Sequence, residues 1–355
     1  MSPSGTTAGL GLYRAKPYEN DGGFSVQGLA LTTGVGVLVA VVMGVVAAIV
    51  GQFFYAVFIF PLFIGAAVGA GQTWAIRHTK IRTPLACGAA GLVAGVVAVT
   101  TMHYVDYVNF RQGMNEANFE EQSLREAIAD TTDPKERQYL HEVLAEFESD
   151  PEVVAAMQVN SFTSYLDWSA RQGVEISSAY GNSGGLNLGH TGTFIYWGVE
   201  ALIVALISAA MARRRAGAPF CVACDAWKTE RELGWLLAPA KAVGEVVQSG
   251  RLAELPAMAG TSDGQSSISV YECPSCPEQA DVVLEVNAIT YNHGTREKSP
   301  QARAIYPRGA AADLTRYFVS LEDTPISGNN DTAVARKVET VADGQQTGEL
   351  VASNR

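Results

Sequence analysis

Long uninterrupted runs of apolar residues dominate the first third of the chain and return once near its middle. They cover about residues 28–50, 53–76, 84–103 and 193–212. As a helix, each run can cross a hydrocarbon core of about 30 Å, where every backbone group must be hydrogen-bonded within the segment. The pattern therefore predicts four transmembrane helices. Because the first run is long and the second follows almost at once, we do not expect a cleaved signal peptide.

Basic residues flank the predicted spans at three places. They lie in the N-terminal tail (Arg14 and Lys16), in the loop 77–82 and at Arg213–Arg215 after the fourth run. Such residues mark the cytoplasmic side of a span, and with four spans all three places fall on one side. We therefore expect an integral membrane protein, in contact with the lipid bilayer, with both termini cytoplasmic. The tail would cover residues 1–27, and residues 104–190 would be extracytoplasmic.

Small residues recur at four-residue spacing inside the predicted spans, as at Gly65 and Gly69 and at Gly91 and Gly95. This spacing lets helix backbones approach closely. We interpret it as packing within one bundle, and a contact between copies in a homo-oligomer is the alternative.

Glu200 is the one acidic residue inside a predicted span. A carboxyl group in that position is costly, and a functional role is the default hypothesis. The alternative is a protonated or hydrogen-bonded side chain that faces other helices, or one near enough to the interface to stay hydrated. Few other polar groups lie in the spans, whereas a transport path usually needs several.

The predicted extracytoplasmic region, residues 104–190, shows apolar positions at helical spacing. We expect helices at 115–129, after Asp133-Pro134, after Asp150-Pro151 and at 161–172. Its 15 acidic and 5 basic residues predict a solvated acidic surface, with a cation-binding or partner-binding face as the alternative. Residues 181–185 match the Gly-x-Ser-x-Gly pattern of serine hydrolases. No strand and helix flank the match, as that motif requires, so we interpret it as a loop.

Two Cys-x-x-Cys pairs follow the last apolar run, at Cys221 and Cys224 and at Cys273 and Cys276. Each pair can direct two thiolates at one metal, and two pairs give the four-thiolate set of a structural zinc site. An iron–sulfur cluster or another metal, and a redox-active dithiol, are the alternatives. We interpret Cys87, in the third run, as a packing residue.

The two pairs resemble the knuckles of a zinc ribbon. They depart from its pattern because 48 residues separate Cys224 from Cys273, whereas about 15–20 are usual. The whole chain also resembles bacterial inner-membrane proteins of several spans and unassigned function, which carry a cytoplasmic zinc-ribbon region after the last span. That resemblance implies location and architecture, and no activity.

The residues around the cysteines predict a small α+β domain over 213–326. Helix-like stretches lie at 231–237 and 240–255, and strand-like runs at 266–271, 280–291 and 302–306. Asn292-His293-Gly294 reads as a hairpin turn, and 313–321 as a short helix or strand. From about residue 327 onward the composition predicts disorder. The predicted fold class is a membrane all-α protein of four transmembrane helices, with a helical extracytoplasmic insertion and a zinc-ribbon-like α+β cytoplasmic domain.

The formal net charge of −11 argues against nucleic-acid binding, which rests on Lys and Arg contacts to phosphate. The chain has no phosphate-cradling loop and no His-Glu-x-x-His pattern, so we do not expect an enzyme. We expect a membrane-anchored scaffold or adaptor whose metal-stapled domain binds a protein partner or forms a homo-oligomer. The alternatives are a small-solute transporter or channel that uses Glu200, and a thiol redox membrane protein.

Overall fold

The four predicted apolar runs lie in four long helices of a computed structural model, which describes residues 13–51, 59–176, 186–258, 265–276, 281–292 and 295–322. These helices are α1 (Val26–Gly51), α2 (Ile59–Thr79), α3 (Pro84–Asp130) and α7 (Gly189–Ala216). All four are long and apolar enough to cross a membrane, as the sequence predicts. The first residues of the second predicted run, 53–58, lie outside the described part of the chain.

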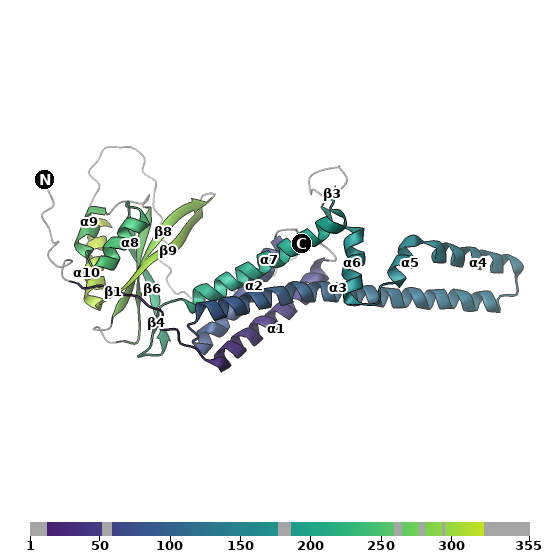
Figure 1. Ribbon diagram of the computed structural model, residues 1–355, viewed down its shortest axis with the longest axis horizontal. Coiled ribbons are helices and arrows are strands. Elements are labelled where there is room, and N and C mark those ends of the chain that lie inside the picture. The colour runs from purple at the N-terminus through teal and green to yellow at the C-terminus, as the bar shows by residue number, and fades with distance from the viewer. Residues whose placement is uncertain are drawn as a thin grey trace, which may run out of the picture.

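The four helices form a bundle in which α1 and α7 each pack against both α2 and α3 (Figure 1). Its interior is built from small residues, because Ala40, Ala94 and Ala98 are fully buried. Large apolar side chains face outward instead, as Leu38 and Phe63 are 65% and 70% exposed. A bundle with small residues inside and large apolar residues outside is suited to a lipid environment.

The closest approach in the bundle lies between α3 and α7. A Cβ atom added to Gly91 would lie 2.6 Å from the Cα atom of Ala209, and Gly95 meets the backbone of Ala205 in the same way. The Ser208 hydroxyl also donates a hydrogen bond to the Gly91 carbonyl across this contact. The four-residue spacing of these glycines therefore serves packing within the chain.

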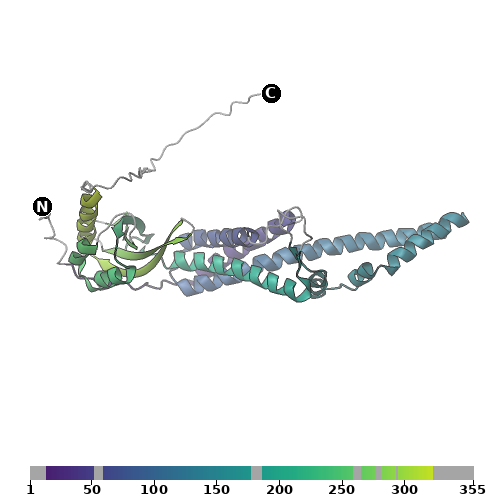
Figure 2. The same cartoon turned by 90° about the horizontal axis from the view of Figure 1, so that it is seen from above.

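Helix α3 continues well beyond the predicted end of its span. The sequence predicts a span that ends near His103 and a separate helix at 115–129, but a single helix of 47 residues joins them. No proline interrupts residues 104–114, and Tyr107 and Phe110 continue one helix face by packing against Tyr165. The helix therefore projects out of the bundle as an arm (Figures 1 and 2).

Shorter helices return along the arm, as predicted. Helix α4 (Pro134–Ser149) packs back on α3, and the Asp133 carboxylate caps it by accepting a hydrogen bond from the Lys135 amide at 2.9 Å. Helices α5 (Pro151–Met157) and α6 (Phe162–Gln172) lead back to the bundle, where a two-stranded ladder of β2 (Glu175–Ile176) and β3 (Leu186–Asn187) precedes α7. The Gly-x-Ser-x-Gly match at 181–185 lies outside the described residues.

A five-stranded antiparallel sheet lies at the other end of the bundle (Figure 1). Its strand order is β1-β9-β8-β7-β6. The strands are β1 (Lys16–Pro17), β6 (Thr229–Leu236), β7 (Ser266–Glu272), β8 (Val282–Asn292) and β9 (Thr295–Tyr306). A separate two-stranded hairpin, β4 (Phe220–Cys221) and β5 (Ala226–Trp227), connects α7 to the sheet.

Helices α8 (Ala240–Ser249), α9 (Leu255–Met258) and α10 (Arg308–Glu322) pack with a 3₁₀ turn (Leu252–Glu254) against one face of the sheet. Residues Leu236, Val243, Leu284 and Leu314 are among those fully buried in this core. Alternate strand positions supply the buried side chains, as expected for a sheet that covers a core on one face. This domain therefore has an apolar core of its own.

Several elements of the sheet domain differ from the sequence prediction. Residues 231–237 are helix-like in composition but form most of β6, because pairing with β7 along the whole strand overrides local propensity. The predicted helix 240–255 stops at Gly250, whose φ of 80° ends α8 in the left-handed conformation. The sequence does not predict that Lys16–Pro17 pairs with β9. Residues 313–321 belong to α10. The hairpin residues 293–294 and the tail predicted to be disordered lie outside the described residues.

Candidate metal centre

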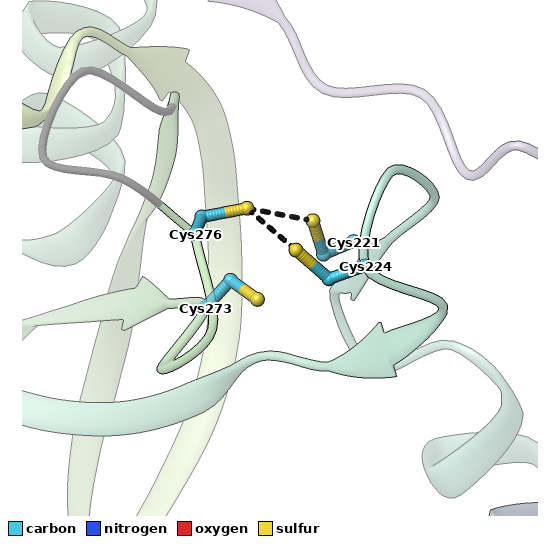
Figure 3. A group of neighbouring side chains, drawn as sticks. All are labelled: Cys221, Cys224, Cys273 and Cys276. Atoms are coloured by element: carbon cyan, nitrogen blue, oxygen red, sulfur yellow. Dashed lines mark hydrogen bonds between the residues drawn. The ribbon is translucent and has the colours of Figure 1, made fainter.

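The first cysteine pair lies in the β4–β5 hairpin, directly after α7. The Asp225 amide donates a hydrogen bond to the Val222 carbonyl at 3.3 Å and closes the turn between the two cysteines. Asp225 has a φ of 48°, a left-handed conformation that Asp tolerates better than most residues. The turn thereby brings the Cys221 and Cys224 side chains to one side of the hairpin (Figure 3).

The second pair lies where β7 ends. The Cys276 amide donates to the Cys273 carbonyl at 3.4 Å, so this pair also forms a tight turn. Cys273 is buried and Cys276 is half-buried. Because β7 is an inner strand of the sheet, the sheet domain fixes the position of this pair.

The four sulfur atoms lie within 4.8 Å of one another, although they come from segments far apart in the sequence (Figure 3). The Cys276 Sγ atom is 3.0 Å from that of Cys224 and 3.3 Å from that of Cys221. A tetrahedral zinc–thiolate site places its sulfurs about 3.8 Å apart, whereas a disulfide bond is about 2.05 Å long. The arrangement fits four thiolates around one metal ion, as the sequence predicts.

The thiols differ in acidity. Burial acts to raise the pKa of Cys221, but the Cys224 amide and the neighbouring thiols outweigh it and lower that pKa to about 7. The hydrogen bond to Cys276 lowers the pKa of Cys224, but burial and the thiols of Cys273 and Cys221 outweigh it and raise that pKa. Hydrogen bonds with the Cys224 and Cys221 thiols raise the pKa of Cys276. Cys221 therefore ionises more easily near neutral pH than Cys224 or Cys276, and a bound cation would stabilise the thiolate form of its ligands.

The first pair is anchored to the helix bundle through Trp227. Its indole Nε1 donates a hydrogen bond to the Arg77 carbonyl at 3.2 Å. The Arg215 guanidinium lies 4.3 Å from the centre of the Trp227 ring, a cation–π geometry. Trp227 thus contacts the last turns of both α2 and α7.

Two further contacts join the same hairpin to the loop between α2 and α3. The Arg82 guanidinium lies 4.2 Å from the centre of the Phe220 ring, and Lys80 forms an ion pair with Asp225. The basic residues of this loop therefore have a structural role in the fold. They hold the β4–β5 hairpin on the end of the bundle.

The second pair is held by the sheet domain instead. The Arg308 Nη1 atom of α10 lies 3.4 Å from the Cys276 carbonyl oxygen and donates to it, and its Nη2 atom is 3.6 Å from Glu272 at the end of β7. The cluster is thus divided, with two thiols on a hairpin docked to the bundle and two on the sheet. The sequence identifies the four cysteines by their spacing, but it contains no signal for this division.

Glu200 and Cys87 lie elsewhere. Cys87 is buried in the first turn of α3, away from the cluster. Glu200 is 2% exposed within α7, and its Oε1 atom has no hydrogen-bond partner among the described residues. One turn before it, the Trp197 ring lies 4.8 Å from the His103 ring of α3. The structure thus places Glu200 in the bundle interior and does not bring it to the cysteines.

Comparison of the chain with protein family models, with curated proteins and with solved structures found no match. The expected zinc-ribbon and membrane-protein resemblances therefore gain no support from known proteins.

Proposed function

We propose that the chain is a membrane-anchored scaffold or adaptor in which a metal ion, zinc being the best fit to four thiolates, ties the soluble sheet domain to the helix bundle. The observation that supports it most directly is the division of the cysteine cluster between the two units. A metal ion with ligands on both would fix the orientation of the sheet domain at the membrane. A fixed orientation is what a docking platform needs.

The membrane placement rests on the outward-facing apolar side chains of the bundle and on the position of the basic residues. The end of α2, the loop between α2 and α3 and the end of α7 all lie at the end of the bundle that adjoins the sheet domain (Figure 1). These segments carry the basic residues Arg77, Lys80, Arg82 and Arg213–Arg215. Under the positive-inside rule this end faces the cytoplasm. The sheet domain and the metal centre would then be cytoplasmic, and the acidic arm would be extracytoplasmic.

The first test is the native mass of the detergent-purified full chain, which reports bound metal and oligomeric state together. We expect one zinc ion per chain in the wild type and none after Cys224→Ser. The matched control is Cys87→Ser, which changes a cysteine outside the cluster and should keep the metal. A wild-type protein without metal would contradict the metal centre. A wild-type protein without metal and with two disulfide bonds would also contradict the cytoplasmic placement, because disulfides persist in oxidising compartments.

The adaptor role needs a second readout, because bound metal alone does not show a partner. We expect crosslinking in intact native cells to join the wild-type sheet domain to a defined protein or a second copy. Cys224→Ser should reduce that product at least tenfold at equal expression, and Cys87→Ser should leave it unchanged. A chain that binds metal but crosslinks to nothing would remove the adaptor role and keep the metal centre.

A second candidate function, a small-solute transporter or channel, is favoured by Glu200, whose buried Oε1 atom has no hydrogen-bond partner among the described residues. Burying an ionisable side chain in a membrane-spanning helix is energetically costly, which makes a functional role the default hypothesis. Proteoliposomes with a trapped pH dye would report proton flux through the wild-type chain. On this hypothesis Glu200→Gln abolishes the flux and leaves the native mass unchanged, and equal flux in both proteins would exclude the role.

A further inference from the structure

The face of the sheet opposite its helices is polar, although it is buried. Ser267 and Ser269 of β7 are fully buried there, and Glu285 and Asn287 of β8 are 3% and 2% exposed. Direct cross-strand pairs place Ser267 beside Asn287 and Ser269 beside Glu285. Buried polar groups normally find hydrogen-bond partners, so a group on this face without a partner is unusual.

The sheet itself covers the face by curling over it. Strands β6 and β9 are separated by two other strands, about 14 Å on a flat sheet. Nevertheless Glu232 of β6 accepts hydrogen bonds from Arg296 at 2.8 Å and from Lys298 at 2.7 Å, both on β9. The Arg296 guanidinium also lies 3.0 Å from the centre of the Trp235 ring of β6. The free half of the β8–β9 hairpin therefore folds over the floor formed by β7 and β8.

At the end of this face near Glu285 and Glu230, the carboxylates have hydrogen-bond or ion-pair partners. Glu285 forms an ion pair with Arg303 and accepts a hydrogen bond from the Tyr271 hydroxyl at 3.1 Å. Glu230 accepts from the Ser269 hydroxyl at 2.9 Å and from Tyr271 at 3.1 Å. Burial and these two carboxylates raise the pKa of Tyr271, which keeps the phenol protonated as a donor. Every carboxylate at this end therefore has donors.

The other end has donors left over. The Ser267 Oγ, Asn287 Nδ2 and Arg296 Nε atoms are buried and have no hydrogen-bond partner among the described residues. A β-bulge opposite Asn287 re-aims this part of the hairpin, where Pro300 supplies no amide donor. Charge is also unbalanced here, because Arg296 and Lys298 share the single carboxylate of Glu232. The missing group is therefore a hydrogen-bond acceptor beside two cations that share one carboxylate.

We propose that the curled face of the sheet binds a small monocarboxylate, whose oxygens accept hydrogen bonds from Ser267, Asn287 and Arg296. A carboxylate supplies the lone pairs that these donors lack and neutralises the excess positive charge of the Arg296 and Lys298 pair. Ser267 and Asn287 lie on the face of the sheet that the β8–β9 hairpin folds over, and Arg296 lies on that hairpin. The site does not involve the cysteines, so it stands apart from the function proposed above.

Acetate and benzoate are the probes, measured by equilibrium dialysis of the radiolabelled acids against the full chain in detergent, with chloride at constant ionic strength. We expect saturable binding of at least one probe, with one site per chain. Ser267→Ala and Asn287→Leu should weaken that binding at least tenfold. The matched controls are Ser299→Ala and Asn292→Leu, which change exposed residues of the same hairpin and should bind as the wild type does.

Thermal unfolding of the same proteins separates loss of the site from loss of the fold. In the absence of probe, Ser267→Ala and Asn287→Leu should unfold no lower than the wild type, because each removes a buried unpaired group. The probe should raise the melting temperature of the wild type and the controls only. The proposal is overturned by a wild type that binds neither acid, or by site variants and controls that bind alike. It is also overturned if the site variants unfold earlier and neither acid shifts the wild type, which would indicate ordered water.

Discussion

At the scale of single residues, Asp167 is the side chain that joins α6 to the start of α7. Its Oδ1 atom lies 3.0 Å from the His190 Nε2 atom, and its Oδ2 atom accepts a hydrogen bond from Arg171 at 2.9 Å. The hydrogen bond from His190 and that from Arg171 lower the pKa of Asp167 below its usual 3.8. A carboxyl group with a lowered folded-state pKa stabilises the fold above its unfolded pKa, and that contribution disappears as pH falls through the lowered value.

We therefore expect acid to loosen α6 from α7 below about pH 4. Asp167→Asn should remove this pH dependence, so that amide hydrogen exchange in α6 is faster than wild type at pH 6 and equal to it at pH 3. Asp130→Asn, which changes a carboxylate at the tip of the arm, is the control and should follow the wild type. Equal exchange of α6 in all three proteins at pH 6 would contradict the role of Asp167.

Residue identity and spacing were sufficient to single out the four cysteines that the fold brings together, because metal-ligand chemistry imposes a spacing that can be read directly. It was insufficient for the contacts that hold the first cysteine pair. Trp227 reads as an ordinary aromatic residue, and its partners Arg77 and Arg215 read as membrane-flanking charges. Only the fold brings the three together, so no local pattern could have predicted their contact.

At the scale of elements, the pairing of α3 and α7 depends on the absence of a side chain at Gly91. Gly91→Ala would place a Cβ atom 2.6 Å from the Cα atom of Ala209, and backbone atoms cannot move aside as a flexible side chain can. We expect the variant to lower the melting temperature in detergent by several degrees, as overpacking costs about 1–3 kcal/mol.

Gly113 in the same helix is the matched control, since a Cβ atom there would meet nothing within 4 Å. Gly113→Ala should leave stability unchanged or raise it by up to about 1 kcal/mol, because alanine is the better helix former. A Gly91→Ala protein as stable as Gly113→Ala would show that the two helices are not in tight contact.

Helices and strands could be predicted where a single local sequence pattern was enough to specify them. Uninterrupted apolar runs predicted the four long helices, and Asp-Pro pairs predicted the starts of α4 and α5. The prediction was wrong at 231–237, where long-range pairing decides between helix and strand. It was also wrong at the end of α3, because hydrophobicity marks where an apolar segment ends and not where the helix ends. The closeness of the paired strands β1 and β9 could not be predicted, since Lys16 and Ile305 are far apart in the sequence.

At the scale of the whole molecule, the cysteine cluster proposed to hold a metal lies between two units that each have their own core. Removing the metal should therefore release the joint without unfolding either unit. After chelation under reducing conditions we expect faster amide hydrogen exchange in residues 219–228, in the α2–α3 loop and around Cys273. The buried strands β7 and β8 and helix α8 should keep their protection.

Cys224→Ser should give the same exchange pattern without chelator, and Cys87→Ser should resemble the untreated wild type. Faster exchange throughout the sheet would mean that the metal holds the domain core itself together and does not act mainly between the units.

The length of α3 has a mechanical consequence. At 1.5 Å per residue its 47 residues make a single rod of about 70 Å, which begins at Pro84 beside the hairpin of the first cysteine pair. A helix without a proline or other break beyond its first turn is stiff. If such a rod pivots at that end by about 5°, its tip at Asp130 moves by roughly 6 Å. The acidic arm and the hairpin of the first cysteine pair therefore lie at opposite ends of one stiff helix. A displacement of either end would change the angle of the helix at the other end.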